Sequence, residues 1–278
     1  MKSIDIYCPA RINLHLNIDG FNKEKELHYL NLVNQTINIF DVINIRKNNK
    51  KEVPLQINAN LEVLEYLYDD LFKIYQLFYS YTKKEFDGIV VGIEKNIPIR
   101  SGLGDKSSII AGFLVGLNEI YHTNLSNHEL IFLTSLVNFE APYFIKGGYA
   151  KVFNVGNKIT PLKNNPYNNY LVIIPDIKVN TKDMFYNLDK LGDKKLREGI
   201  FQNDFTNIMP EELKRIRDFL REYPDIFHSL SGIGPAYFIA SEKYIDPKIK
   251  KVLKEEFPNC MIYTNVKNSL QRKIVRNY

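Results

Sequence analysis

The feature that most constrains this chain is a glycine-containing loop at residues 98–108 that leads directly into its longest apolar run, Ile109–Leu117. The loop reads Pro98-Ile-Arg-Ser-Gly-Leu-Gly-Asp-Lys-Ser-Ser108, and the residues after it predict a helix from about Lys106 to Tyr121. Glycines let a backbone approach a ligand closely, and amides at a helix N-terminus favour an anion. The loop is not a Walker motif, because Asp105 stands where that motif needs glycine. By itself the pattern fits either a phosphate site or an ordinary turn before a buried helix.

Alternation of apolar and polar residues predicts strands at Ile4–Tyr7, Ile12–Ile18 and Thr36–Ile45, the first two flanking Pro9 as paired strands. Residues 61–81 carry leucine, isoleucine and tyrosine at the spacing of an amphipathic helix. Further strands are expected near Gly88–Ile93, Tyr149–Val155, Tyr170–Pro175, Ala236–Ala240 and Met261–Asn265, and further helices near Asn127–Val137, Lys182–Leu191, Glu211–Arg221 and Lys248–Glu256. Strands and helices without regular alternation predict an α+β fold rather than a doubly wound sheet.

A chain of 278 residues is long enough for one large or two medium domains. The best candidate for a linker is Thr160–Asn169, which contains two prolines and several Asn and Lys residues. We therefore expect one domain at residues 1–160, carrying the glycine loop, and a second at residues 161–278.

Charge and composition exclude several classes of function. The 37 Lys and Arg against 32 Asp and Glu give a net charge of only +5, and the basic residues are scattered, which favours a solvated surface over nucleic-acid binding. No apolar run approaches the roughly 18 residues that span a bilayer, and no signal pattern opens the chain. The two cysteines, Cys8 and Cys260, have no metal or redox spacing. We expect a cytoplasmic protein, monomeric or weakly dimeric, without nucleic-acid or membrane partners, although a plastid-type organelle stays open.

The order of the motifs resembles one family along nearly the whole chain. The glycine loop is similar to the Pro-x-x-x-Gly-Leu-Gly-x-x-Ser-Ser loop of the GHMP kinases. Segments before and after it match in the right order, namely Pro9–Leu16, the stretch from His28 to Asp41, Phe139–Gly148, and Ser231–Phe238. The resemblance implies a two-domain α+β fold, with an N-terminal domain like ribosomal protein S5 and a C-terminal α/β sandwich.

The same resemblance implies ATP-dependent phosphorylation of an alcohol, with Mg²⁺ as the metal cofactor. The branch it resembles most acts on a cytidine diphosphate-linked methylerythritol in non-mevalonate isoprenoid biosynthesis. By position, Glu140 and Arg11 would be catalytic, as base and orienting cation, and no residue is assigned as a metal ligand. The residues expected to bind ATP are Pro98, Ile99, Arg100, Ser101, Gly102, Leu103, Gly104, Asp105, Lys106, Ser107 and Ser108. Those expected to bind substrate are Asn13, His28, Thr181 and Phe185.

Several of these positions depart from the family pattern. Glu140 and Arg11 stand where the family has Asp and Lys, and the extra methylene of Glu moves a carboxylate by roughly 1.3–1.5 Å. The two changes could compensate for each other, or they could be a relic ion pair. Asp105 is expected to cap the helix and so to occupy amides that a phosphate needs. Leu27 replaces a stacking tyrosine. The alternatives are therefore a degraded pseudokinase and a GHMP kinase for another alcohol.

Overall fold

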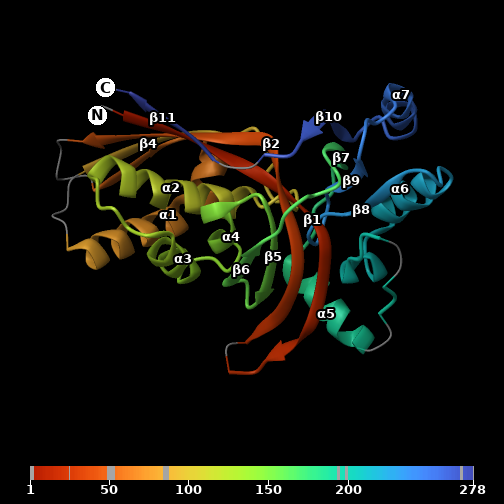
Figure 1. Ribbon diagram of the computed structural model, residues 1–278, viewed down its shortest axis with the longest axis horizontal. Coiled ribbons are helices and arrows are strands. Elements are labelled where there is room, and N and C mark those ends of the chain that lie inside the picture. The colour runs from red at the N-terminus through yellow and green to blue at the C-terminus, as the bar shows by residue number, and fades with distance from the viewer. Residues whose placement is uncertain are drawn as a thin grey trace.

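The computed structural model describes residues 3–24, 26–48, 54–83, 88–192, 195–197, 200–269 and 272–277. Two β-sheets lie side by side, each with its own helices, and the chain ends meet at one edge of the first sheet (Figure 1). The α+β class predicted from the sequence is confirmed. No helix in the described part of the chain is long and apolar enough to cross a membrane.

The first sheet is built around a long antiparallel ribbon. Its two strands, β1 (Ser3–Asn22) and β2 (Leu27–Asn48), pair over almost their full length. In the described residues the sheet has the order β11-β1-β2-β4-β3, and β5 and β6 branch from β2. The remaining strands are β3 (Leu55–Asn58), β4 (Gly88–Glu94), β5 (Tyr149–Asn154), β6 (Lys158–Pro161) and β11 (Lys273–Asn277).

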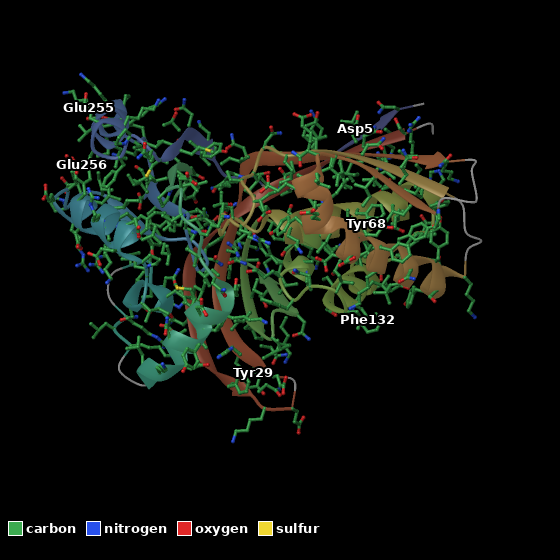
Figure 2. The ribbon with its side chains drawn as sticks, turned by 180° about the vertical axis from the view of Figure 1, so that it is seen from behind. Asp5, Tyr29, Tyr68, Phe132, Glu255 and Glu256 are labelled. Carbon is green, nitrogen blue, oxygen red and sulfur yellow. The ribbon has the colours of Figure 1, made fainter. Side chains whose placement is uncertain are left out.

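Four helices pack against this sheet and against each other, α1 (Leu61–Thr82), α2 (Asp105–Tyr121), α3 (Asn127–Ser135) and α4 (Ala141–Lys146). Helix α2 approaches the sheet most closely, because a Cβ added at Gly112 or Gly116 would overlap Cys8 Sγ or Ile45 Cδ1. This contact fixes the N-terminus of α2 relative to β1. The exposed rings of Tyr68 on α1 and Phe132 on α3 lie on the outer side of the helical layer (Figure 2).

The second sheet has the order β10-β7-β9-β8 in the described residues. Its strands are β7 (Asn169–Ile174), β8 (Phe227–Leu230), β9 (Tyr237–Ser241) and β10 (Met261–Lys267). The helices of this half are α5 (Thr181–Leu191), the 3-10 turn η2 (Asp204–Asn207), α6 (Glu211–Arg221) and α7 (Pro247–Glu256).

The two sheets share a buried apolar cluster. It combines Ile12 of β1 and Ile37 of β2 with Val172 of β7 and Phe238 of β9, and Leu103 of the glycine loop packs into it. Backbone contacts also join the halves, since Ala236 N–H donates to Ser101 O at 2.8 Å. The glycine loop is therefore held by both halves of the molecule.

Several boundaries differ from those expected. Ile4–Tyr7 and Ile12–Ile18 do not pair with each other but form the single strand β1, whose register shifts at Pro9/Ala10, where a proline without an N–H is tolerated. Met261–Asn265 does not close the chain, because the short and polar β11 follows it and pairs with β1. The division at 160/161 stays a prediction, and it falls within β6.

Candidate active site

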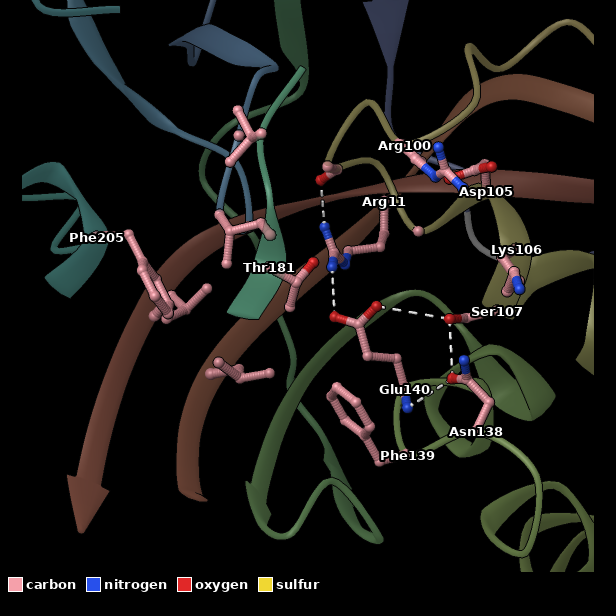
Figure 3. A pocket seen from close by; sticks show the side chains of 18 of the residues that line it. Arg11, Arg100, Asp105, Lys106, Ser107, Asn138, Phe139, Glu140, Thr181 and Phe205 are labelled. Atoms are coloured by element: carbon pink, nitrogen blue, oxygen red, sulfur yellow. Dashed lines mark hydrogen bonds and ion pairs between the residues drawn. The ribbon is translucent and has the colours of Figure 1, made fainter. Parts of the chain in front are cut away.

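A cleft of about 480 Å³ lies between the two halves of the protein (Figure 3). The glycine loop and the start of α4 form one side, and α5 with the turn at residues 232–234 forms the other. The residues that line it are Arg11, Leu16, Ile18, Leu30, Leu32, Glu65, Tyr66, Arg100, Gly102, Gly104, Asp105, Lys106, Ser107, Asn138, Phe139, Glu140, Val179, Thr181, Phe185, Phe205, Gly232, Ile233 and Gly234. The cleft therefore joins the predicted phosphate loop to the predicted catalytic pair.

The loop has a conformation that needs glycine at two positions. Gly102 and Gly104 have φ of +80° and +75°, in the left-handed region. A Cβ at Gly102 would lie 2.6 Å from Gly234 O, and one at Gly104 would lie 2.6 Å from Phe144 Cζ. The backbone therefore passes close to its neighbours and opens onto the N-terminus of α2.

Arg11 connects the loop to the carboxylate of Glu140. The Arg11 side chain is 4% exposed, and its Nη1 donates to Gly102 O and its Nη2 to Glu140 Oε1, both at 2.6 Å. The Arg11 backbone N–H also donates to Leu103 O at 2.8 Å. Glu140 itself is the residue that precedes α4, and its side chain is 32% exposed. One carboxylate oxygen is thus fixed by a buried cation while the group remains open to the cleft.

Ser107 and Asn138 complete this corner of the cleft. The Ser107 hydroxyl lies 2.9 Å from Asn138 Oδ1 and 3.5 Å from Glu140 Oε2. The side chains of Arg11, Ser107, Asn138 and Glu140, called the acceptor cluster below, face one another across the cleft wall (Figure 3).

A second group of ionisable side chains meets at Asp105 of the loop and is called the buried cluster: Asp41, Lys95 and Asp105, with the half-buried Tyr66 beside them. Lys95 Nζ lies 2.5 Å from Asp41 Oδ2 and 3.5 Å from Asp105 Oδ2, and both carboxylates are almost fully buried. Burial raises the pKa of Asp105; Lys95 opposes this rise and Asp41 adds to it. Burial also raises the pKa of Asp41. One lysine is therefore shared by two buried acids.

The expectation that Asp105 caps α2 is wrong. Gly104 is the residue before the helix, and it provides no side-chain cap. Asp105 is the first residue of the helix, where the Lys95 cation and the Tyr66 side chain hold its carboxylate, and its Oδ2 accepts no hydrogen bond. The start of α2 thus keeps the uncapped form in which a helix N-terminus attracts anions.

Two basic side chains of the loop lie on the ring of Tyr66. Arg100 lies 5.3 Å and Lys106 Nζ 4.4 Å from the ring centre, and Lys106 also donates to Asp70 Oδ2 at 2.8 Å. Both cations line the cleft, so they add positive potential next to the start of α2.

Two of the four predicted substrate residues line the cleft, and they come from α5. Thr181 opens the helix, and Phe185 lies one turn later. His28 reaches the same region from β2, but its ring is stacked on Phe185, with centroids 4.6 Å apart, and it pairs with Asp189 at 2.9 Å. His28 thus covers one face of the Phe185 ring rather than lining the cleft.

The remaining predicted residues do not line the cleft. Asn13 is buried, its Nδ2 donates to Asn34 Oδ1 at 2.6 Å, and its own Oδ1 has no partner. The loop residues that do not line the cleft are Pro98, Ile99, Ser101, Leu103 and Ser108.

Tyr66, Asn138 and Phe139 are among the cleft residues that sequence reasoning did not single out. Tyr66 lies on α1, far from every motif, and no local pattern marks it. Asn138 does carry a signal, because Asn shortly before a helix that opens with Ala141-Pro142 is typical of a side chain that accepts backbone amides.

Comparison with known proteins agrees with this geometry. Residues 68–148 match the family model of the GHMP kinases N terminal domain. The 4-diphosphocytidyl-2-C-methyl-D-erythritol kinase of Clostridium tetani is 34% identical, over 82% of this chain and 88% of its own. A crystal structure of 4-(cytidine 5'-diphospho)-2C-methyl-D-erythritol kinase superposes with a TM-score of 0.70 at 20% identity, covering 95% of this chain and 99% of that one. Homoserine kinase from Cytophaga hutchinsonii superposes with 0.71 at 16% identity, covering 99% and 98%.

The fold and the loop are thus those of a GHMP small-molecule kinase. The chain belongs to the GHMP kinase family, within its group of 4-diphosphocytidyl-2-C-methyl-D-erythritol kinases.

Proposed function

We propose that this protein transfers the γ-phosphoryl group of ATP to a hydroxyl of 4-diphosphocytidyl-2-C-methyl-D-erythritol, in non-mevalonate isoprenoid precursor synthesis. The observation that carries the proposal is the position of the Glu140 carboxylate, which buried Arg11 holds at 2.6 Å. It lies in the same cleft as the glycine loop and the uncapped N-terminus of α2. The names of the similar kinases support the choice of substrate.

Glu140 is the proposed general base. The substrate hydroxyl donates its proton to Glu140 Oε2 as its oxygen bonds to the γ-phosphorus, and the bond from that phosphorus to the β–γ bridging oxygen breaks. Arg11 holds Oε1 and fixes the direction of the carboxylate, while its second nitrogen ties the pair to Gly102 of the loop. Positioning of this kind is the main contribution of a protein to phosphoryl transfer.

The phosphate chain of ATP is proposed to bind at the start of α2, beside Arg100 and Lys106. Mg²⁺ prefers oxygen ligands and is commonly held by one or two protein groups together with phosphates. Ser107 Oγ, on the cleft wall at the start of α2, would supply one such oxygen beside the phosphates, and the described residues contain no cluster of three or more metal-ligating side chains. When bound, the ion would neutralise charge on the phosphates.

The base end of the substrate is proposed to lie against α5, near Thr181 and Phe185. Because His28 is stacked on Phe185, a cytosine would have to use the opposite face of that ring or displace His28. This stack, together with Leu27, also favours a second candidate function, a GHMP kinase for a different small alcohol. The cytoplasmic location and the monomeric or weakly dimeric state stay predictions.

The test is ADP release by the purified protein given magnesium-ATP, with and without 4-diphosphocytidyl-2-C-methyl-D-erythritol. We expect ADP that depends on the substrate and matches the phosphorylated product mole for mole. A panel of other alcohols, including homoserine and mevalonate, distinguishes the second candidate. Absence of ADP with every alcohol, from protein shown to be folded, would leave a pseudokinase.

A further inference from the structure

Asn138 lies two residues before Glu140, immediately before the Phe139–Gly148 segment. Three donors converge on its single side-chain oxygen. Asn138 Oδ1 accepts from the Ser107 hydroxyl and from Glu140 N–H, both at 2.9 Å (Figure 3). It also accepts from Ala141 N–H at 3.0 Å. One amide therefore contacts both the loop helix α2 and the start of α4.

The two backbone contacts fix the peptide that carries Glu140. Helix α4 has only six residues, and a helix so short is not stable by itself. Glu140, which precedes it, provides no side-chain cap of its own. The Asn138 oxygen takes the amides of Glu140 and Ala141 instead, so the position of the Glu140 Cα opposite Arg11 depends on this turn.

The third contact decides where the Ser107 proton goes. A serine hydroxyl has one proton to donate, and Ser107 lies near two acceptors, Asn138 Oδ1 at 2.9 Å and Glu140 Oε2 at 3.5 Å. Donation to the nearer oxygen leaves Glu140 Oε2 able to receive a proton. It also leaves the lone pairs of Ser107 directed away from Asn138.

We propose that Asn138 is a positioning residue, which sets the Glu140 carboxylate against Arg11 and draws the Ser107 proton away from Glu140 Oε2. The catalytic part of this inference rests on the proposed kinase function, whereas the contacts can be tested without it. Asn138 contacts the Glu140 backbone and the Ser107 hydroxyl but not the Glu140 carboxylate, so its effect on the reaction passes through Glu140 and Ser107.

The chain offers a matched control in Asn118, near the end of α2. Its Oδ1 accepts from the Thr123 hydroxyl at 2.7 Å and from Leu125 N–H at 2.8 Å, the same kinds of donor. Asn118 does not line the cleft. Asn138→Ala and Asn118→Ala thus delete equivalent amides, one at the site and one away from it.

The experiment compares kcat and the KM for ATP of both variants with those of the wild type. We expect Asn138→Ala to lower kcat about 10–100-fold, because displacement by about 1 Å can cost that much, with the KM for ATP within about threefold. Asn118→Ala should keep wild-type kcat, and Asn138→Asp, which retains an oxygen at the same place, should recover part of the loss. A wild-type kcat in Asn138→Ala, or an equal loss in both alanine variants, would overturn the proposal.

A second readout does not depend on turnover. The amide protons of Glu140 and Ala141 should exchange with solvent faster in Asn138→Ala than in Asn118→Ala or the wild type. If the wild type shows no kinase activity, the proposed function fails, and unchanged exchange at these amides would then overturn the positioning role separately. If Asn138→Ala does not fold, Asn138→Ser decides: its shorter side chain can take the backbone amides but not reach Ser107, so an undiminished kcat would contradict the role in holding the Ser107 proton.

Discussion

Two clusters of charged side chains contact the glycine loop, and they differ in whether a carboxylate oxygen remains open to the cleft. In the acceptor cluster, Arg11 is buried and pairs with one oxygen of Glu140, whose side chain is 32% exposed to the cleft. In the buried cluster, Lys95 lies between Asp41 and Asp105, and both of these residues are buried. The first arrangement leaves a carboxylate oxygen open to a substrate proton, whereas the second keeps both acids buried, so its main effect is on the stability of the fold.

The contrast also shows that a perturbed pKa does not by itself mark the base. Burial raises the pKa of both Asp41 and Asp105, yet Asp41 is sealed and accepts amide hydrogen bonds from Asn96 and Ile97 at 2.8 and 2.9 Å. Structural ion pairs perturb pKa values just as active sites do. Only the acceptor cluster has a carboxylate oxygen that is open to the cleft beside a fixed cation. We therefore expect changes in the acceptor cluster to affect catalysis and changes in the buried cluster to affect stability.

The largest expected effect is on catalysis, from Glu140→Gln. Removal of a general base typically costs 10²–10⁴-fold in rate, so we expect kcat to fall by about that factor while the melting temperature changes little. The control is Glu119→Gln, which weakens a more exposed ion pair, with Arg276 at 2.7 Å, whose residues do not line the cleft. Initial rates with both substrates saturating measure the effect. A Glu140→Gln enzyme with a tenth or more of wild-type kcat would contradict the role of Glu140.

The opposite signature is expected from Lys95→Met in the buried cluster. Removing one partner of a buried ion pair costs about 3–5 kcal/mol, because the remaining charge is left uncompensated. Denaturant unfolding should show this loss, and kcat per folded molecule should fall far less than in Glu140→Gln. The double variant Lys95→Met/Asp105→Asn should recover part of the stability. If Lys95→Met abolished turnover without lowering the free energy of unfolding, Lys95 would belong to the reaction instead.

Sequence patterns predicted the longer helices of the second half well, because a buried helix face imposes periodicity over many residues. Helix α6 was predicted over its observed residues, and α5 and α7 to within one residue. Several short elements were missed: α4, β3, β6 and β8 are too brief for a periodic signal, and β11 is largely polar. Their positions depend on contacts with residues distant in the sequence, which no local window contains.

The residues of the candidate site divide in the same way, into those that a sequence motif marks and those whose position depends on contacts distant in the sequence. Residues that belong to the family motifs, such as Arg11, Glu140 and Gly102, line one cleft, and the roles that the family resemblance implies for them stay predictions. Asp105 was misjudged because its partners, Lys95 and Tyr66, come from other elements, and local reasoning saw only the helix that follows it. A side chain that could cap its own helix can thus interact instead with a buried partner from another element.

A smaller catalytic effect is expected from Arg11→Lys. Lysine has one nitrogen, so it cannot hold both Gly102 O and Glu140 Oε1 as the guanidinium does, and we expect kcat to fall about 10–100-fold. If Arg11 and Glu140 vary together to keep the carboxylate in place, Arg11→Lys/Glu140→Asp should be more active than either single variant. A double-mutant cycle on kcat measures this coupling. Additive losses would mean that the two residues act independently.

The smallest expected effect is that of Asp105→Asn, and its sign depends on pH. A carboxyl whose pKa is raised in the folded protein binds its proton more tightly there than in the unfolded chain. Above that raised pKa the ionised, buried Asp105 therefore destabilises the fold, and below it the penalty is relieved. At pH values above that raised pKa, Asp105→Asn should accordingly raise stability by about 1 kcal/mol, on the order of an unsatisfied buried polar group.

This advantage should shrink as the pH falls through the raised pKa of Asp105, because the wild-type side chain then becomes neutral like asparagine. Melting temperatures of both proteins from pH 8 to pH 4 test the trend. The KM for ATP should also fall or stay constant in Asp105→Asn, since a negative charge is lost beside the loop. If the variant were instead less stable at every pH, Lys95 would need both carboxylates, and the buried cluster would be a balanced network in which Asp105 stabilises the loop.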